Sequence, residues 1–248
     1  ISRMLGPAGK GVYAIFVADV NLFVLFFGFS INTGITYFVA KKSISKSTIL
    51  GITLYNIVIS ASLLLLTLLL VNNGFLERFI FPSGHYTLNF KILLFSGFLL
   101  TLINGTLKAW FSGEKKFGIV NKVALINAFF NLVIYTALFI GHKFHSQVEQ
   151  NLIFIVLLIF VFAQVLVLII YFLLFKVTGK KINLKISIKK EYKPFMAFVL
   201  MGHLSMLLNF INYRFDLWII NDNCTPEDVG YYSLAANFGG LLMLFTTT

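Results

Sequence analysis

Residues 151–175 read NLIFIVLLIFVFAQVLVLIIYFLLF, a run of 25 residues without Asp, Glu, Lys or Arg. About 20 apolar residues cross the hydrocarbon core of a bilayer as a helix. Four more uncharged runs of at least 20 residues lie at 49–76, 123–142, 194–213 and 229–248. None of them alternates between apolar and polar residues, as the strands of a transmembrane barrel do. The sequence therefore predicts a bundle of membrane-spanning helices.

The composition agrees with a membrane protein. The chain has 248 residues, of which 58% are hydrophobic and 12% charged, and its mean hydropathy is +0.90. An ordinary soluble domain is about 25% charged. The single cysteine, Cys224, excludes a disulfide framework within this chain. The net charge of +11 does not indicate nucleic-acid binding, because most lysines flank the apolar runs, where membrane topology and anionic headgroups account for them.

We predict about seven membrane spans from these runs and from two further apolar segments. They cover residues 12–40, 49–71, 92–111, 118–141, 152–175, 194–221 and 229–248. The first is long enough to tilt or kink and contains Gly28 and Gly34. Because the chain lacks an initiating Met and stops within an apolar run, we expect a fragment of a longer protein.

Positive charge divides unevenly between the two sides that these spans define. Segments 41–47, 108–122 and 176–193 fall on one side and carry 14 of the 20 Lys and Arg residues, whereas the other side carries five. Cytoplasmic loops retain Lys and Arg, so the first side is predicted to be cytoplasmic. Residues 1–11 are then expected to form a loop on the outer side.

One pattern occurs twice. Residues 7–13, PAGKGVY, and residues 226–232, PEDVGYY, share the pattern P-x-x-x-G-x-Y. Six predicted spans separate the copies, so both fall on the outer side, and each opens a span. Parallel repeats of six helices are one plan of membrane transporters. We therefore expect a first lobe at 1–175 that lacks its first helix, a basic cytoplasmic linker at 176–193, and the start of a second lobe at 194–248.

Two stretches carry a resemblance to a known family. ISRMLGPAGKGVYA, at the start of the chain, resembles the turn after the first helix of polysaccharide and lipid-linked oligosaccharide flippases. NYRFDLWIINDNCTPEDVGYYSLA, which ends at Ala235, resembles their seventh helix and the turn into the eighth. The basic segment 176–193 is similar to the family's linker between lobes, so the resemblance covers essentially the whole chain. The same superfamily includes multidrug and toxin extruders and lipid II flippases.

The resemblance implies an all-α, two-lobed, multi-pass carrier in a bacterial or archaeal cell membrane, built of parallel six-helix repeats around a central cavity. Such carriers alternate between inward and outward openings. They move an undecaprenyl-diphosphate-linked sugar from the inner to the outer leaflet without covalent chemistry, so we expect a transporter and not an enzyme. The implied partners are membrane lipid, the lipid-linked sugar and other polysaccharide-assembly proteins, with no cofactor other than a coupling proton or sodium ion.

Ionisable residues inside the spans are the first candidates for a substrate or ion site, because an unpaired charge in lipid is costly. Asp19 and Arg214 are predicted at a similar depth from the outer side, where they pair across the lobes or face one aqueous cavity. The guanidinium of Arg214 suits a diphosphate oxygen as a two-pronged donor, and Asp19 or Asp216 suits a coupling proton or sodium ion. A structural ion pair without cargo contact is the alternative.

Other polar residues form stripes along predicted helices. His203 lies eleven residues before Arg214 and shares its helix face; it is either a proton carrier or a hydrogen-bonded packing group. Asn127 and Asn131 share a face that either joins helices or lines a cavity. Lys108 and Lys122 lie near cytoplasmic ends, where they either extend to the interface or line the cavity mouth. We identify no catalytic or metal-binding cluster in the sequence.

Other functions remain open at this point. A lipid II flippase or a cation-coupled drug extruder belongs to the same superfamily, although Arg214 opposes the acidic cavity that organic cations favour. A membrane-embedded glycan polymerase or acyltransferase would need a catalytic cluster, and no paired carboxylates or His–Asp set is evident. A seven-helix receptor is opposed by the pattern that occurs twice.

Overall fold

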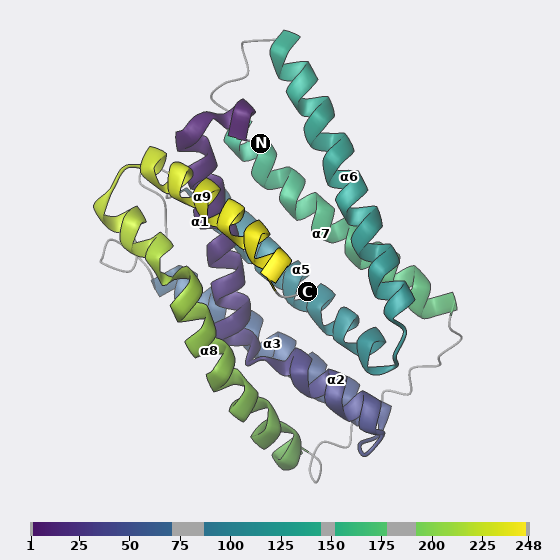
Figure 1. Cartoon of the computed structure of the whole chain (residues 1–248). Coiled ribbons are helices and arrows are strands. Elements are labelled where there is room, and N and C mark those ends of the chain that lie inside the picture. Colours follow the sequence, from purple (N-terminus) through teal and green to yellow (C-terminus); the bar gives the residue numbers. More distant parts are fainter. Residues whose placement is uncertain (1, 71–86, 145–151, 178–191, 247–248) are drawn as a thin grey trace.

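The computed structural model describes residues 2–70, 87–144, 152–177 and 192–246, except for the side chains of 2, 142–144, 175–177, 213–214 and 241–246. Within these residues every regular element is an α-helix (Figure 1), as the sequence predicts. The predicted linker at 176–193 lies almost entirely outside the described residues.

The observed helices follow the predicted spans closely. They are α1 (Ser2–Gly28), α2 (Ile31–Lys41), α3 (Lys46–Leu70), α5 (Leu88–Gly113), α6 (Phe117–Phe144), α7 (Leu152–Val177), α8 (Tyr192–Asn223) and α9 (Pro226–Thr246). Six of these described helices contain a segment long and apolar enough to cross a membrane, namely α1, α3, α5, α6, α7 and α8. Helix α9 occupies the seventh predicted span but is not among the six. The chain is therefore a multi-pass membrane protein, and the part that the structure describes is all-helical.

The first predicted span is broken in two. Phe29 and Ser30 have φ values of 48° and 50°, which a continuing helix does not allow, and they separate α1 from α2. The tilt or kink expected in this span is therefore present as a break directly after Gly28, the last residue of α1. This break points α2 away from the axis of α1 (Figure 1).

The expectation that residues 1–11 form a loop is wrong, because helix α1 begins at Ser2. One residue interrupts it: Gly6 has φ 67° and ψ −178°. Glycine tolerates positive φ, and the residue before a proline avoids helical geometry. Pro7 then starts the main part of α1, a position where its missing N–H costs nothing.

Helix α1 lies at the centre of the bundle and contacts α3, α5, α7, α8 and α9. Its buried Phe16 and Val20 pack with Phe98 of α5 in one apolar cluster. A second cluster joins α2, α5 and α8 through buried side chains such as Ile35, Phe111 and Phe195. The N-terminal helices and α8 therefore share one core, and α1 with α2 forms the face on which α8 and α9 pack.

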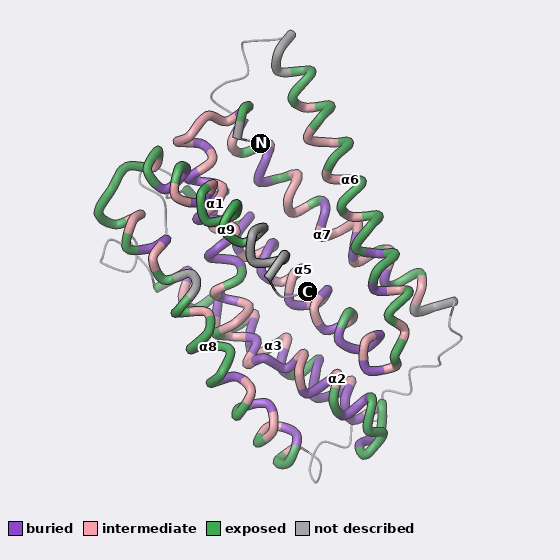
Figure 2. Tube along the Cα trace, in the orientation of Figure 1, coloured by how far each residue is buried: buried purple, intermediate pink, exposed green. Residues whose placement is uncertain are grey.

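Helix α6 is different, because most of its surface is exposed (Figure 2). Its exposed residues are large and apolar, including Leu125, Phe129 and Leu132. In water a continuous apolar surface of this kind is unfavourable, whereas hydrocarbon chains solvate it. The exposed side of α6 is therefore the surface best suited to face lipid.

Candidate functional site

Helices α1 and α9 cross at the two copies of the P-x-x-x-G-x-Y pattern. A Cβ atom added at Gly11 would overlap the carbonyl oxygen of Pro226. Reciprocally, a Cβ atom added at Gly230 would overlap the carbonyl oxygen of Pro7. Only glycine allows two helix backbones to approach so closely. Each copy of the pattern thus supplies the glycine that the other copy's proline carbonyl contacts.

A capping box fixes the start of α9 at this crossing. The side chain of Asp228 accepts hydrogen bonds from the Thr225 hydroxyl (2.6 Å) and backbone N–H (3.0 Å), while the Asp228 N–H donates to the Thr225 hydroxyl oxygen (3.3 Å). This is the reciprocal arrangement that starts many helices. The hydrogen bonds from Thr225 lower the pKa of Asp228. They also hold Pro226 in the first helical turn, next to Gly11.

Asp19 lies deeper along the same interface, between α1 and α8. Its side chain is fully buried, and one carboxyl oxygen, Oδ1, accepts a hydrogen bond from Trp218 Nε1 at 2.9 Å. The other oxygen, Oδ2, has no hydrogen-bond partner among the residues that the structure describes. A buried polar atom without a partner is costly, so the site has unused capacity to bind a proton or a cation.

A third contact joins the two parts of the chain at the break between α1 and α2. Ser30 Oγ and His203 Nδ1 are 2.9 Å apart, and both residues are buried. The next turn of α2 continues the contact, since a Cβ atom at Gly34 would be 2.9 Å from the Phe195 ring of α8. His203 therefore lies on the same interface as Asp19, bonded to the residue at which the first span breaks.

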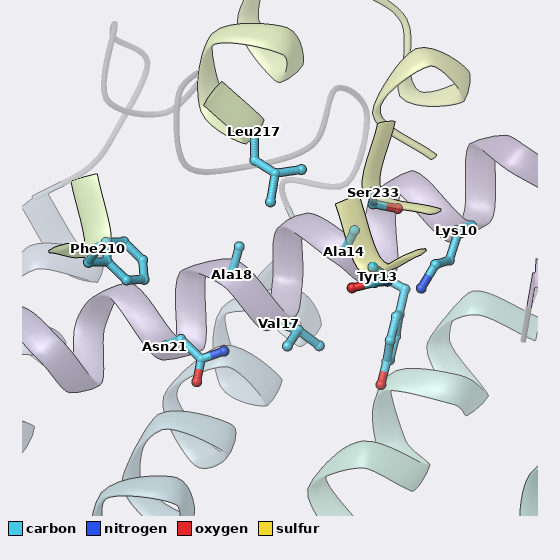
Figure 3. A pocket seen from close by; sticks show the side chains of 10 residues that line it. Lys10, Tyr13, Ala14, Val17, Ala18, Asn21, Phe210, Leu217 and Ser233 are labelled. Carbon is cyan, nitrogen blue, oxygen red and sulfur yellow. The ribbon is translucent and has the colours of Figure 1, made fainter. Parts of the chain in front are cut away.

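A cavity of about 140 Å³ with both apolar and polar wall residues lies between α1, α8 and α9 (Figure 3). Helix α1 contributes Lys10 and Asn21 to its wall, and α9 contributes Ser233 and Asn237. The Lys10 ammonium lies 5.2 Å from the centre of the Tyr13 ring, a cation–π distance. Sequence reasoning assigned Lys10 to an outer loop; its helical position shows that it faces the cavity.

The remaining predicted site residues are dispersed. Asp216 accepts hydrogen bonds from its neighbour Leu217 N–H and from the Tyr232 hydroxyl, and so joins α8 to α9. Asn131 donates to Asn127 on α6, with distances of 2.8 Å to its carbonyl oxygen and 3.1 Å to Oδ1.

Three charged candidates are not assembled with Asp19 and His203 by any described contact. Lys108 and Lys122 are exposed on α5 and α6. Arg214 lies in α8, but its side chain is outside the described residues. The pairing of Arg214 with Asp19 therefore stays a prediction. The observed partner of Asp19, Trp218, was missed, because the two residues are 199 positions apart and no local pattern relates them.

The arrangement offers positions for ions and polar groups. Among the described residues, no group of three or more His, Cys, Asp or Glu side chains could hold a metal ion. The features that stand out are the glycine crossing, the buried Asp19 and the cavity beside Lys10, all between α1 and the pair α8 and α9.

Comparison with known proteins identifies the family of the chain. A family model described as "Polysaccharide biosynthesis protein" matches residues 1–248, the whole chain. No curated protein and no solved structure matches the chain.

Proposed function

The chain belongs to the polysaccharide biosynthesis protein family, a family of membrane flippases, and we propose on that premise that it moves a lipid-linked glycan across the membrane. The proposed cargo is an undecaprenyl-diphosphate-linked oligosaccharide or polysaccharide precursor, which passes from the inner to the outer leaflet. The proposed mechanism is alternating access between two lobes, without covalent chemistry. We assign α1–α7 to the first lobe, and α8 and α9 to the second.

The single observation that carries this proposal is the reciprocal glycine crossing of α1 and α9. The two copies of one sequence pattern meet there, as equivalent helices of two repeats would. At its closest point this contact joins glycines to main-chain carbonyl groups. No ion pair joins the described side chains of α1 and α9, so these can separate without breaking one. A carrier needs a contact between its lobes that is close in one state and separates in the other state of each cycle.

Separation of α1 and α9 would also change the environment of Asp19. Helix α9 packs on α8, so a movement of α9 away from α1 shifts Trp218 away from the Asp19 carboxyl group. Water then reaches Asp19, and a proton or sodium ion can exchange. Closing the contact between α1 and α9 buries the group again. Asp19 is therefore the proposed coupling site, and the Ser30–His203 contact is a second bond that changes between the two states.

Cations near the interface would hold the diphosphate. Lys10 lines the cavity between α1, α8 and α9, and Arg214, on α8, remains the ligand proposed from the sequence. An ammonium acts on phosphate as a point charge, whereas a guanidinium donates in pairs. Asn21 and Asn237 lie in the same cavity wall and offer amide groups to sugar hydroxyls.

The test is a transport assay with the full-length protein in vesicles. A fluorescent undecaprenyl-diphosphate-linked sugar is loaded into one leaflet, and its arrival in the other is followed by quenching with a membrane-impermeant reagent. We expect protein-dependent movement that Arg214→Ala reduces and Arg214→Lys partly retains, with unchanged protein yield. Extrusion of ethidium-like cations with no movement of the lipid would contradict the proposal and favour a drug extruder.

A further inference from the structure

A second cavity, of about 500 Å³, lies where the α2–α3 turn meets the α5–α6 turn, on the predicted cytoplasmic side. It is distinct from the interface between α1 and α8, and the proposed transport does not use it. Lysines dominate its wall, which consists of Val39, Ala40, Lys42, Lys46, Gly113, Glu114, Lys115 and Lys116. Retention of positive charge on the cytoplasmic side explains why lysines occur in both turns. It does not explain why they converge on one cavity.

The two turns are held in place by a close helix contact. A Cβ atom at Gly113, the last residue of α5, would be 2.8 Å from the carbonyl oxygen of Thr36 and from the Cβ of Val39 on α2. The Thr36 hydroxyl also donates to the carbonyl oxygen of Ala109 on α5, at 3.3 Å. The backbones that carry the lysines are therefore fixed relative to each other.

Glu114 organises part of the cavity. Its side chain is only 9% exposed, and its carboxylate lies 2.9 Å from Lys46 Nζ and 3.4 Å from Lys116 Nζ. The indole N–H of Trp110 donates to the same carboxylate at 3.2 Å. Two ammonium groups are thereby oriented by a nearly buried acid, although an ammonium has three N–H donors and retains capacity for another acceptor.

Two further lysines complete the wall. Lys42 directly follows the last residue of α2, and Lys115 lies two residues beyond the end of α5. Both have left-handed backbone geometry, with φ of 56° and 60°. Four lysines against one carboxylate leave the cavity strongly cationic. A ligand that matches it must be a compact anion with several acceptor oxygens, since each ammonium contributes separate donors. A phosphate group has this chemistry.

We propose that this cavity binds the phosphate of an anionic phospholipid from the inner leaflet. Basic pockets between membrane helices on the cytoplasmic side bind such headgroups. The surroundings favour a lipid over free phosphate. Phe117, directly after Lys116, is 57% exposed and begins the exposed apolar face of α6, along which acyl chains can lie. The Tyr37 ring is 39% exposed and lies in the last turns of α2, as interface aromatics do.

The test compares two double variants of the full-length purified protein that lose the same charge. Lys42→Ala with Lys115→Ala removes two lysines from the cavity wall. Lys41→Ala with Lys122→Ala removes two exposed lysines of the same predicted side that do not line it. Both pairs lose two positive charges, and Lys41 is the neighbour of Lys42 in the sequence. The two double variants therefore differ in whether the lost lysines line the cavity. The probes are phosphatidylglycerol, phosphatidylcholine and inorganic phosphate, with bound lipid counted by mass spectrometry of the intact complex.

We expect the cavity pair to weaken phosphatidylglycerol binding roughly 10-fold to 30-fold, from the contribution of two lysines near a headgroup. The control pair should change it by less than about 3-fold, and Lys42→Arg with Lys115→Arg should retain it. Equal losses in the two Ala pairs would show diffuse attraction and overturn the site. Equal binding of phosphatidylcholine, or binding of inorganic phosphate without preference for the lipid, would overturn the lipid assignment. Binding is measured without transport, so a failed transport assay would not decide this question.

Discussion

The two ends of the bundle are built on different principles. At the predicted outer end, Gly11 and Gly230 let two backbones touch, and no space remains for a methyl group. At the predicted cytoplasmic end, four lysines and one nearly buried carboxylate line a cavity of about 500 Å³. The outer contact therefore depends on shape and the inner cavity on charge. The outer end should respond to one added carbon atom, and the inner end to salt and lipid.

The largest expected effect follows from adding that carbon atom. In Gly11→Ala or Gly230→Ala the new methyl group overlaps a carbonyl oxygen of the facing helix, so α1 and α9 must move apart. Overpacking of this kind costs about 1–3 kcal/mol or more. We expect a lower melting temperature and a population of the closed crossing reduced by at least about tenfold, since 1.4 kcal/mol corresponds to a factor of ten in an equilibrium constant. Flipping, which needs the closed state in each cycle, should fall with it.

Two other glycines serve as matched controls. Cβ atoms at Gly118 and Gly141 of α6 would meet nothing within 4 Å. Gly118→Ala and Gly141→Ala should leave flipping and melting near their wild-type values. If all four variants behave alike, the close crossing has no special role.

The next effect concerns Asp19 and separates stability from coupling. Trp218→Phe removes the N–H that donates to Asp19 and leaves a buried carboxyl group without its partner, which costs about 1–3 kcal/mol. Asp19→Asn retains an acceptor oxygen for Trp218 but cannot bind and release a proton. We expect the first variant to melt earlier, and the second to fold normally and lose the dependence of flipping on a proton or sodium gradient. A gradient dependence that survives in Asp19→Asn would exclude Asp19 as the coupling site.

The sequence predicts the helices of the bundle better than it predicts the contacts at its two ends. Apolar runs placed the spans well, because α5, predicted at 92–111, is observed at Leu88–Gly113. The repeated pattern named Pro7 and Gly11, yet nothing in it showed that the copies touch. Residues 1–11 were misassigned because Gly6 and Pro7 resemble a turn, although one positive φ lets the helix resume immediately. These failures share a cause: contacts between distant helices leave no local periodicity.

The cavity at the predicted cytoplasmic end shows that a count of charges along the sequence has the same limit. Counting lysines in 41–47, 108–122 and 176–193 predicted the orientation, but the count did not include Glu114. The structure shows that Glu114 is nearly buried and bonded to Lys46 and Trp110. That arrangement follows from the contact of α2 with Gly113, which the count does not contain.

A smaller effect is expected at the break between α1 and α2. Ser30→Ala removes the hydroxyl group that is 2.9 Å from His203 Nδ1 and leaves the buried imidazole without that bond. A lost hydrogen bond of this kind costs about 1 kcal/mol. We expect a modest drop in melting temperature, measured in detergent, while Ser205→Ala, at an exposed position of the same α8, should change nothing. Identical melting temperatures of the two variants would show that the Ser30–His203 contact does not stabilise the protein.

The smallest effect belongs to the capping box of α9, and its pH dependence has a defined sign. Hydrogen bonds from Thr225 lower the pKa of Asp228 in the folded protein. The stabilisation is therefore present above the pKa of the unfolded chain and is lost as the pH falls through the lower pKa of the folded state. Thr225→Ala should lower the melting temperature slightly at neutral pH, and the difference should disappear in acid. A difference that persists unchanged in acid would contradict the capping role.

The most direct test of the whole account is to tie α1 to α9 reversibly. In a Cys224→Ser background, cysteines replace Ala8 and Glu227, one on each helix beside the crossing, and a short cleavable thiol reagent joins them. The account predicts that crosslinked protein in vesicles stops moving the lipid-linked sugar and that cleavage of the reagent restores movement. Transport at the full rate by completely crosslinked protein would show that α1 and α9 need not separate, and would contradict the central claim.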